Sequence, residues 1–186
     1  MKKAILLSVQ PKWCELIASG RKTVEVRKTK PKLQMPFKCY IYCTKDNTDI
    51  RPKRIWWKSD KTGFRHIMNG KVIGEFLCDK IIDFGNLGTD NWQFLCGDVH
   101  EWHKRLIMEK SCLSEKEFLA YGGRYGWHIS DLVMYDKPKE LRFFKKINRD
   151  CWYADLGLTK RDCPECQNEE CFLQKPPQSW CYVEEA

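Results

Sequence analysis

The sequence predicts a mainly β protein of the α+β class, in which short strands form a barrel flanked by a few helices. Three observations support this fold. Short runs rich in β-branched and aromatic residues are separated by turn residues, only a few segments show helical spacing, and no internal repeat is present. The expected architecture is therefore a β-barrel with helices packed at its ends.

The length of 186 residues allows one well-buried core and a short appendage. The amino-acid composition changes at Cys151, where a segment rich in cysteine begins. We therefore expect a β-barrel domain over residues 1–150 and a cysteine-rich C-terminal extension over residues 151–186.

The first two elements have clear local signals. Residues 4–9 form an apolar, β-rich run that predicts a strand. Pro11 then stands where helices often begin, Trp13, Leu16 and Ile17 follow at helical spacing, and Gly20 is a typical helix terminator. This region is expected to form a strand, a helix and a turn.

The next segment, residues 23–27, alternates between polar and apolar side chains, as a strand with one solvent-exposed face does. Val24 and Val26 would lie on one face, and Thr23, Glu25 and Arg27 on the other. We expect the three polar side chains to share a surface. One interpretation of Glu25 and Arg27 is an ordinary surface ion pair, which contributes well under about 1 kcal/mol.

Later elements follow the same local rules. Ser114 and Glu117 have the spacing of a capping box and predict a helix that ends at residues 122–123. Gly74 is expected to mark a bulge within a strand. The remaining predicted strands are residues 37–44, 71–84, 127–135 and 141–144.

Positive charge is concentrated in the first third of the chain. The net charge is +8, and residues 1–65 contain 17 Lys and Arg against 5 Asp and Glu. Such asymmetry indicates either a surface that faces a polyanion or a solvated basic face. A long excursion over residues 45–69 combines cations with two tryptophans, which suits phosphate contact and base stacking; an alternative is a surface loop anchored by its own tryptophans. The candidates there are Arg51, Lys53, Arg54, Trp56 and Trp57.

The segment 5–30, ILLSVQPKWCELIASGRKTVEVRKTK, resembles the opening of ASCH domains, a branch of the PUA-like superfamily. Its centre follows the pattern Gly-x-Lys-Thr-x-Glu-x-Arg, from Gly20 to Arg27. The pieces VIGEF (72–76) and GWHISD (126–131) lie where that family has its inner strand and its aromatic-started strand. The resemblance extends over about residues 4–147.

This resemblance implies a PUA-like barrel with a cleft between the barrel and the first helix, used for RNA or modified nucleosides. It assigns nucleic-acid binding to Lys22, Glu25, Arg27, Lys28 and His128. Lysine and arginine supply cationic donors for phosphate, and glutamate can orient them or accept from a base edge. We therefore expect an RNA-binding or modified-nucleoside-binding module that uses this motif and a basic face.

An RNA-processing enzyme is the alternative. One subset of the family is similar to N4-acetylcytidine amidohydrolases, whose pattern has a threonine at the position of Glu25, so this sequence lacks that hydroxyl nucleophile. Other relatives have been proposed to be ribonucleases, which need only a base and cations. Lys22, Thr23 and Glu25 are the candidate catalytic residues, and the sequence leaves binding and catalysis both open.

The extension carries the strongest metal signal. Cys163 and Cys166 have the C-x2-C spacing of zinc knuckles, Cys171 follows, and Cys181 or Cys151 would complete a tetrahedral set. An Fe–S cluster or reduced thiols fit the same spacing. We expect no required cofactor and hold a structural zinc site on Cys163, Cys166, Cys171 and Cys181 as a hypothesis. Residues 180–183 are apolar enough to return to the barrel as an edge strand or plug.

The sequence predicts a cytoplasmic location without membrane association. It contains no apolar run near the roughly 20 residues that span a bilayer, and the first apolar run stops at Gln10, before a signal-peptide core is complete. Eleven cysteines, an odd number, also argue against a complete disulfide framework. No feature points to a particular protein partner.

Overall fold

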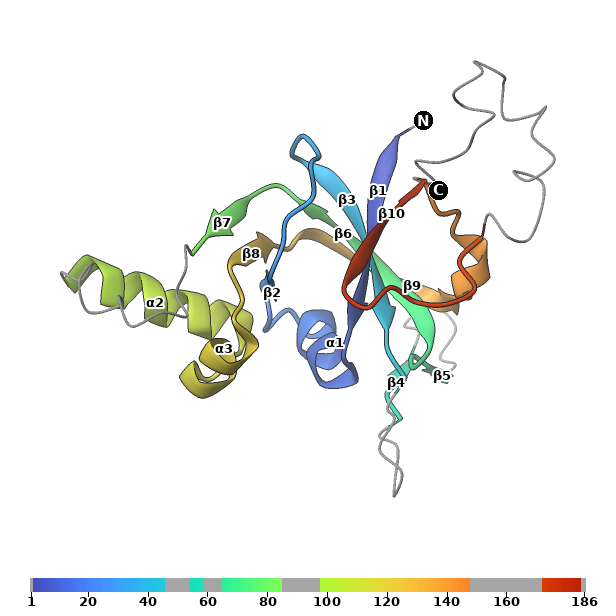
Figure 1. Ribbon diagram of the computed structural model, residues 1–186. Coiled ribbons are helices and arrows are strands. Elements are labelled where there is room, and N and C mark those ends of the chain that lie inside the picture. The colour runs from blue at the N-terminus through green and yellow to red at the C-terminus, as the bar shows by residue number, and fades with distance from the viewer. Residues whose placement is uncertain (1, 46–53, 59–64, 85–97, 148–171, 185–186) are drawn as a thin grey trace, which may run out of the picture. The chain divides into compact units, whose positions relative to one another are not determined.

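A computed structural model describes residues 2–45, 54–58, 65–84, 98–147 and 172–184 (Figure 1). The described residues are mainly strands with a few helices, which confirms the predicted α+β, mainly β fold class. No helix within these ranges is both long and apolar enough to cross a membrane.

The chain folds as two compact units, each built from several chain segments. Unit 1 contains Met1–Pro11, Lys38–Glu75 and Val133–Ala186, and unit 2 contains Lys12–Phe37 and Phe76–Leu132. Neither unit corresponds to the predicted division into residues 1–150 and 151–186, because both units contain segments from residues 1–150. Residues 148–171, which include the predicted boundary, lie outside the described ranges.

A five-stranded sheet has the order β10-β1-β3-β6-β9. Its strands are β1 (Lys3–Val9), β3 (Phe37–Cys43), β6 (Lys71–Cys78), β9 (Ser130–Lys139) and β10 (Trp180–Glu184). The chain's first strand pairs in parallel with β3, with Leu6 opposite Tyr40, and antiparallel with β10, with Leu6 opposite Cys181. Among the described residues, β10 and β9 are therefore the two edges of this sheet (Figure 1).

The core of unit 1 lies on this sheet. Leu6, Tyr40 and Val72 come from neighbouring strands and are fully buried. Phe144 packs on Tyr40 with a ring-centroid distance of 4.9 Å. Because the central strands β1 and β3 are buried almost throughout, their sequences are continuous apolar runs rather than alternating ones.

Gly74 lies where two strands of unit 1 approach closely. A Cβ atom placed on Gly74 would be 2.5 Å from the carbonyl oxygen of Val133 and 3.2 Å from Cα of Met134. Contacts this short with backbone atoms exclude any side chain. The glycine that suggested a bulge therefore marks a close approach of β6 and β9.

Residues 141–144 do not form the predicted last strand. Leu141–Phe143 is a 3-10 helix, η2, in which Phe143 N–H donates to the Glu140 carbonyl and Phe144 N–H to that of Leu141. These local bonds occupy the backbone groups that a strand would offer to a neighbour, and the turn places Leu141 and Phe144 in the core. A short antiparallel pair, β4 (Trp56–Lys58) and β5 (Arg65–Ile67), also belongs to unit 1.

Unit 2 combines an antiparallel sheet in the order β2-β8-β7 with three helices. Its elements are α1 (Pro11–Ala18), β2 (Val24–Arg27), β7 (Ile81–Asp83), α2 (Asp98–Ser111), α3 (Glu115–Tyr121) and β8 (Tyr125–His128). Val26, Phe84 and Phe118 form the centre of its core, and the last two rings meet edge to face at 5.5 Å. The helix α2 was not predicted from the sequence.

The capping box at the start of α3 is confirmed. Glu117 N–H donates to the Ser114 hydroxyl at 3.2 Å, and Ser114 N–H donates back to the Glu117 carboxylate at 3.0 Å. The same carboxylate accepts a hydrogen bond from Lys12 of α1 at 2.8 Å. The hydrogen bonds from Lys12 and Ser114 lower the pKa of Glu117 from its ordinary value of 4.5 to about 2.

This shift predicts an acid-dependent loss of stability. Because the pKa of Glu117 is lower in the folded chain, its ionised form stabilises folding fully above pH 4.5, and this contribution is lost as the pH falls toward 2. The unfolding free energies of the wild type and of Glu117→Gln in urea should therefore differ most near pH 6, and the difference should shrink steadily as the pH falls toward 2. A difference that stays constant over this range would contradict the assignment.

Candidate nucleic-acid interface

The segment after α1 is fixed by its backbone. Gly20 adopts a φ of 71°, which favours glycine, and its N–H donates to the Ile17 carbonyl to end the helix. Thr23 N–H then donates to the Lys110 carbonyl of α2 at 2.9 Å, and the Thr23 carbonyl accepts from Ile129 N–H at 2.9 Å. Lys22 and the start of β2 are thereby held between α2 and the end of β8.

Lys22, Glu25 and Arg27 form one buried ion-pair network, with exposed fractions of 2%, 6% and 5%. The Lys22 ammonium lies 3.3 Å from Oε2 of Glu25, and Nη2 of Arg27 lies 3.0 Å from Oε1. Lys22 also donates to the Ser111 carbonyl at 2.6 Å. One carboxylate therefore faces two cations in a site that excludes water.

The prediction of an exposed polar face on β2 is wrong, as is the interpretation of Glu25 and Arg27 as a surface ion pair. All four residues of β2 are buried. Val26 packs on Phe118 of α3, and Ser111 at the end of α2 contacts Lys22. Both faces of the strand are thus covered, which the alternation of polar and apolar residues alone does not reveal.

The buried network limits what these residues do chemically. Lys22 and Glu25, two of the three candidate catalytic residues, are brought together, but each is engaged by the other and both are shielded from solvent. Thr23 joins the arrangement through its backbone hydrogen bonds. Paired and inaccessible charges suit the positioning of β2 better than proton transfer to a substrate.

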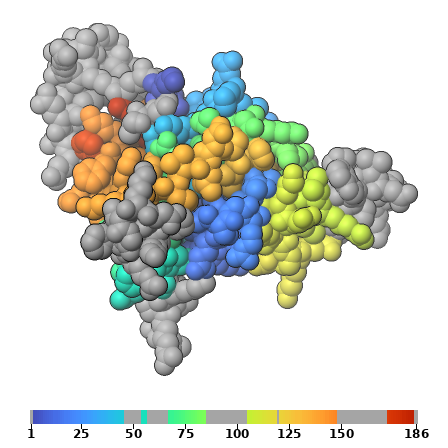
Figure 2. All heavy atoms as spheres, turned by 180° about the vertical axis from the view of Figure 1, so that it is seen from behind, coloured from blue at the N-terminus to red at the C-terminus, as the bar shows by residue number. Residues whose placement is uncertain are grey.

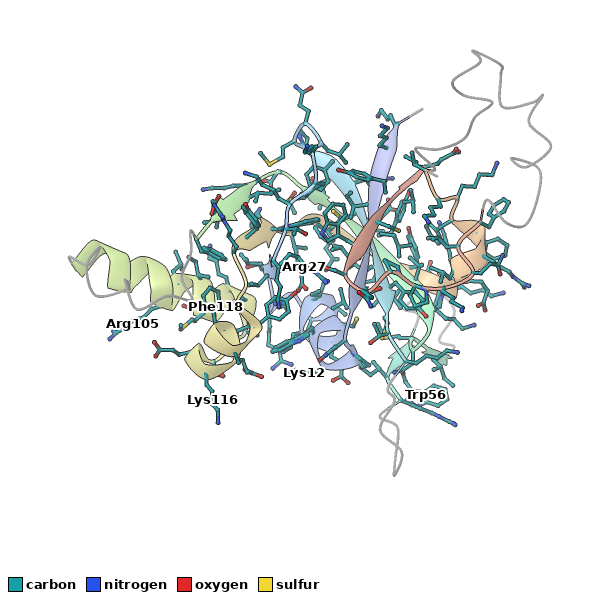
Figure 3. All side chains as sticks on the ribbon, in the orientation of Figure 1. Lys12, Arg27, Trp56, Arg105, Lys116 and Phe118 are labelled. Carbon is teal, nitrogen blue, oxygen red and sulfur yellow. The ribbon has the colours of Figure 1, made fainter. Side chains whose placement is uncertain are left out.

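Trp13 of α1 lies beside the same network. The Lys12 ammonium is 4.0 Å from the centre of the Trp13 ring and the Lys22 ammonium is 5.0 Å from it. Figure 2 shows this part of the surface, where the blue of α1 and the following segment adjoins the yellow-green of α2 and α3. In Figure 3, Arg105 and Lys116 project outward from α2 and α3, whereas Arg27 lies among other side chains beside β2.

Exposed cations and aromatic rings gather immediately beyond the buried network. The Lys28 ammonium lies 5.4 Å from the Tyr121 ring and the Lys30 ammonium 5.1 Å from the Tyr125 ring. The Arg124 guanidinium is 5.3 Å from the same Tyr125 ring. We call these residues, Lys28, Lys30, Tyr121, Arg124 and Tyr125, the basic–aromatic surface.

Backbone pairing places this surface against the motif. Tyr125 is opposite Arg27 in the β2–β8 ladder, and Arg124 N–H donates to the Arg27 carbonyl at 3.0 Å. A Cβ atom on Gly123 would lie 2.2 Å from Val26, so only glycine allows the chain to pass here. Burial raises the pKa of Tyr121, while the interaction with Arg27 opposes this rise. The ring therefore links the buried network to the exposed surface.

The other predicted binding residues lie elsewhere. His128 of β8 is partly exposed and pairs with Asp79 at 2.7 Å. Arg54 and Trp56 are exposed, and Trp56 is 53% accessible. Trp57 lies in β4 beside Trp56, and its side chain lies outside the description. Arg51 and Lys53 lie outside the described residues.

Three of the four predicted zinc ligands, Cys163, Cys166 and Cys171, lie outside the described residues. The fourth, Cys181, lies in β10, and burial raises the pKa of its thiol to about 11, which disfavours the thiolate that zinc binds. Within the described ranges no group of three or more metal-ligating side chains occurs. The zinc site remains a prediction.

Residues 7–83 match the family model of the ASCH domain. This segment of the chain is therefore similar to an ASCH domain. This match contains Gly20, Lys22, Glu25 and Arg27, and it confirms the resemblance on which the sequence analysis relied. All of β8, and three of the five residues of the basic–aromatic surface, lie C-terminal to the matched residues.

Three solved structures are similar to this chain. The crystal structure of ASCH from Zymomonas mobilis is 19% identical, with a TM-score of 0.47, and the match covers 98% of this chain and 88% of that one. Two point mutants of the same protein are 18% identical, with TM-scores of 0.45 and 0.46; the matches cover 98% of this chain and 89% and 91% of those chains. No curated protein matches the chain.

Sequence reasoning missed four residues of the basic–aromatic surface: Lys30, Tyr121, Arg124 and Tyr125. Two of the three contacts, Lys28 with Tyr121 and Lys30 with Tyr125, join residues more than 90 positions apart, so no local spacing reveals them. The segment YGGRY at 121–125, in which two tyrosines flank a glycine pair and an arginine, was the available signal.

Proposed function

We propose that this protein is an RNA-binding module that holds single-stranded RNA on the basic–aromatic surface of unit 2. The main support is a set of three cation–aromatic contacts next to the ASCH-like motif, on residues that are all exposed except the partly buried Tyr125. The ASCH domain supports nucleic-acid or nucleoside binding at the level of the family.

The chemistry of this surface suits a single strand. Lys28, Lys30 and Arg124 offer cations for phosphate oxygens, and Tyr121 and Tyr125 offer rings on which bases stack. Stacking accepts every base, so the expected binding has weak sequence preference.

In this proposal the buried network supports the surface from within. Glu25 holds Arg27 through their ion pair. Arg27 in turn is opposite Tyr125 in the β2–β8 ladder and its side chain contacts the Tyr121 hydroxyl. Lys22 and Glu25 thus act as positioning residues. This assignment replaces the direct phosphate contact that the sequence predicted for Lys22 and Arg27, because side chains exposed by 2% and 5% offer a strand almost no surface.

RNA cleavage or base deacylation is the other function that the sequence left open. No feature of the described site favours it over binding, because the lysine and the carboxylate it would use are paired with one another. The binding experiment below includes a readout for it.

The test is a salt titration of binding to a labelled single-stranded RNA, followed by gel analysis of the RNA. The double variant Lys28→Ala/Lys30→Ala removes two phosphate contacts, so the slope of log K against log salt should fall by about 1.4, at about 0.7 per contact for single strands. The control is Lys110→Ala/Lys116→Ala, which removes two exposed charges from helices of the same unit.

The control variant should keep the wild-type slope. If both double variants lost affinity equally, binding would reflect net charge and the assigned surface would be wrong. Absence of binding at low salt would overturn the RNA proposal. RNA that the wild type cleaves and Lys22→Ala leaves intact would favour the enzyme.

A further inference from the structure

A groove in unit 1 lies entirely outside the basic–aromatic surface. It has a volume of about 890 Å³, within the range of small-molecule sites, and is open to solvent. Residues from five separate chain segments line it: Ser8, Tyr42, Thr44, Lys45, Gly70, 140–142 and 173–178. All of them belong to unit 1.

One of the lining residues, Tyr42, offers a hydroxyl without a hydrogen bond to any described residue. Tyr42 is 3% exposed and lines the groove, but none of the described side chains or backbone groups hydrogen-bonds with its hydroxyl. This hydroxyl is not among the buried polar atoms that lack a partner, so it is open to the groove, where a ligand would replace solvent as its hydrogen-bond partner.

The groove is basic at its margin. Lys45, Arg142 and Lys175 are exposed and line it, whereas the one lining carboxylate, Glu140, is neutralised by an ion pair with Lys71 at 2.5 Å. The stem of Lys45 lies over Gly70, where an added Cβ would be 3.2 Å from Cε. The groove therefore has a net positive charge, which favours an anionic ligand.

One wall is held in place before any ligand binds. Residues 173–178 are fixed at one end by Leu173 N–H, which donates to the Phe144 carbonyl at 2.9 Å. At the other end the Ser8 hydroxyl donates to the Pro177 carbonyl at 2.6 Å. A wall that is already ordered reduces the entropy cost of binding.

We propose that this groove binds a nucleoside phosphate, either free or within an RNA chain. Lys45, Arg142 and Lys175 would contact the phosphate, and the Tyr42 hydroxyl would donate to the base or sugar. Leu141, Pro176 and Pro177 provide an apolar surface for the base, and Gln174 and Gln178 offer amides for its edge. The site goes beyond the proposed function because it uses none of the residues of unit 2.

Calorimetric titrations with adenosine 5′-monophosphate, inorganic phosphate and a short single-stranded RNA test this site. Arg142→Ala/Lys175→Ala should weaken binding of the nucleotide or the RNA at least tenfold, whereas Lys2→Ala/Lys3→Ala, which removes two exposed lysines of the same unit, should not. Tyr42→Phe removes only the hydroxyl and should weaken binding about fivefold, the effect of one hydrogen bond.

The outcomes separate the two ligand sources. Binding of the free nucleotide identifies a nucleotide site, and binding of RNA alone identifies an additional strand contact. The site is overturned if neither probe binds, if phosphate binds as tightly as the nucleotide, or if Arg142→Ala/Lys175→Ala changes nothing. RNA binding that depends on Lys28 and Lys30 but not on Arg142 and Lys175 would overturn this site and leave the proposed function standing.

Discussion

Replacing Glu25 by glutamine is expected to destabilise the fold by about 3–5 kcal/mol, the cost of removing one partner from a buried ion pair. The substitution conserves shape but leaves Lys22 and Arg27 without their counter-ion in a site that water does not enter. The free energy of unfolding in urea measures the effect.

A matched control is available on the same unit. Asp83 pairs with Arg124 at 3.2 Å, but their side chains are 42% and 45% exposed, so Asp83→Asn should cost at most about 1 kcal/mol. If Glu25→Gln were as mild as Asp83→Asn, the buried network would not be the structural centre of the ASCH motif. Lys22 and Glu25 would then be free to take the catalytic roles considered above.

Truncating Trp127 to alanine should destabilise the protein by a similar amount, about 3–5 kcal/mol. Trp127 is fully buried, and Phe37 packs against it edge to face at 5.8 Å. The truncation removes the largest buried side chain and leaves a cavity that β8, paired on both sides, has little freedom to fill.

Trp56→Ala serves as the control for this prediction because Trp56 is 53% exposed, so its loss should change stability by less than about 1 kcal/mol. A small effect of Trp127→Ala would contradict the view that this residue anchors the core of unit 2.

Elements with local signals were predicted well. The helix from Pro11 to Ala18, its glycine terminator and the capping box of Ser114 and Glu117 all occur as expected. In each case the residues that give the signal lie within the element they predict or next to it in the sequence. Short-range rules suffice for such elements.

The burial of β2 could not be read from its own residues. Alternation of Val24, Glu25 and Val26 describes a strand with one wet face, but α2 and α3, which contact Lys22 and Val26, come from some 85 residues later in the chain. The predicted exposed face is covered because Ser111 of α2 contacts Lys22 and Tyr121 of α3 contacts Arg27, so its polar residues form a buried network instead of a binding surface.

The prediction of a strand at residues 141–144 was wrong for a related reason. Apolar and aromatic composition favours a strand there, but Leu141 and Phe144 reach the core three positions apart, the spacing of a 3-10 turn. The apolar composition predicts that these side chains are buried. It does not predict whether a strand or a 3-10 helix buries them, because that depends on the tertiary environment.

The pairing of β1 with β10 has a consequence for the order of folding. Lys3 of β1 faces Glu184 of β10, so the apolar first strand leaves the ribosome long before its second neighbour exists. Until residues 180–184 have been synthesised, one edge of β1 presents unpaired backbone groups beside apolar side chains, a surface prone to intermolecular strand pairing. Completion of this sheet therefore awaits the end of translation of these residues, and chaperones that shield exposed strands would act in that interval.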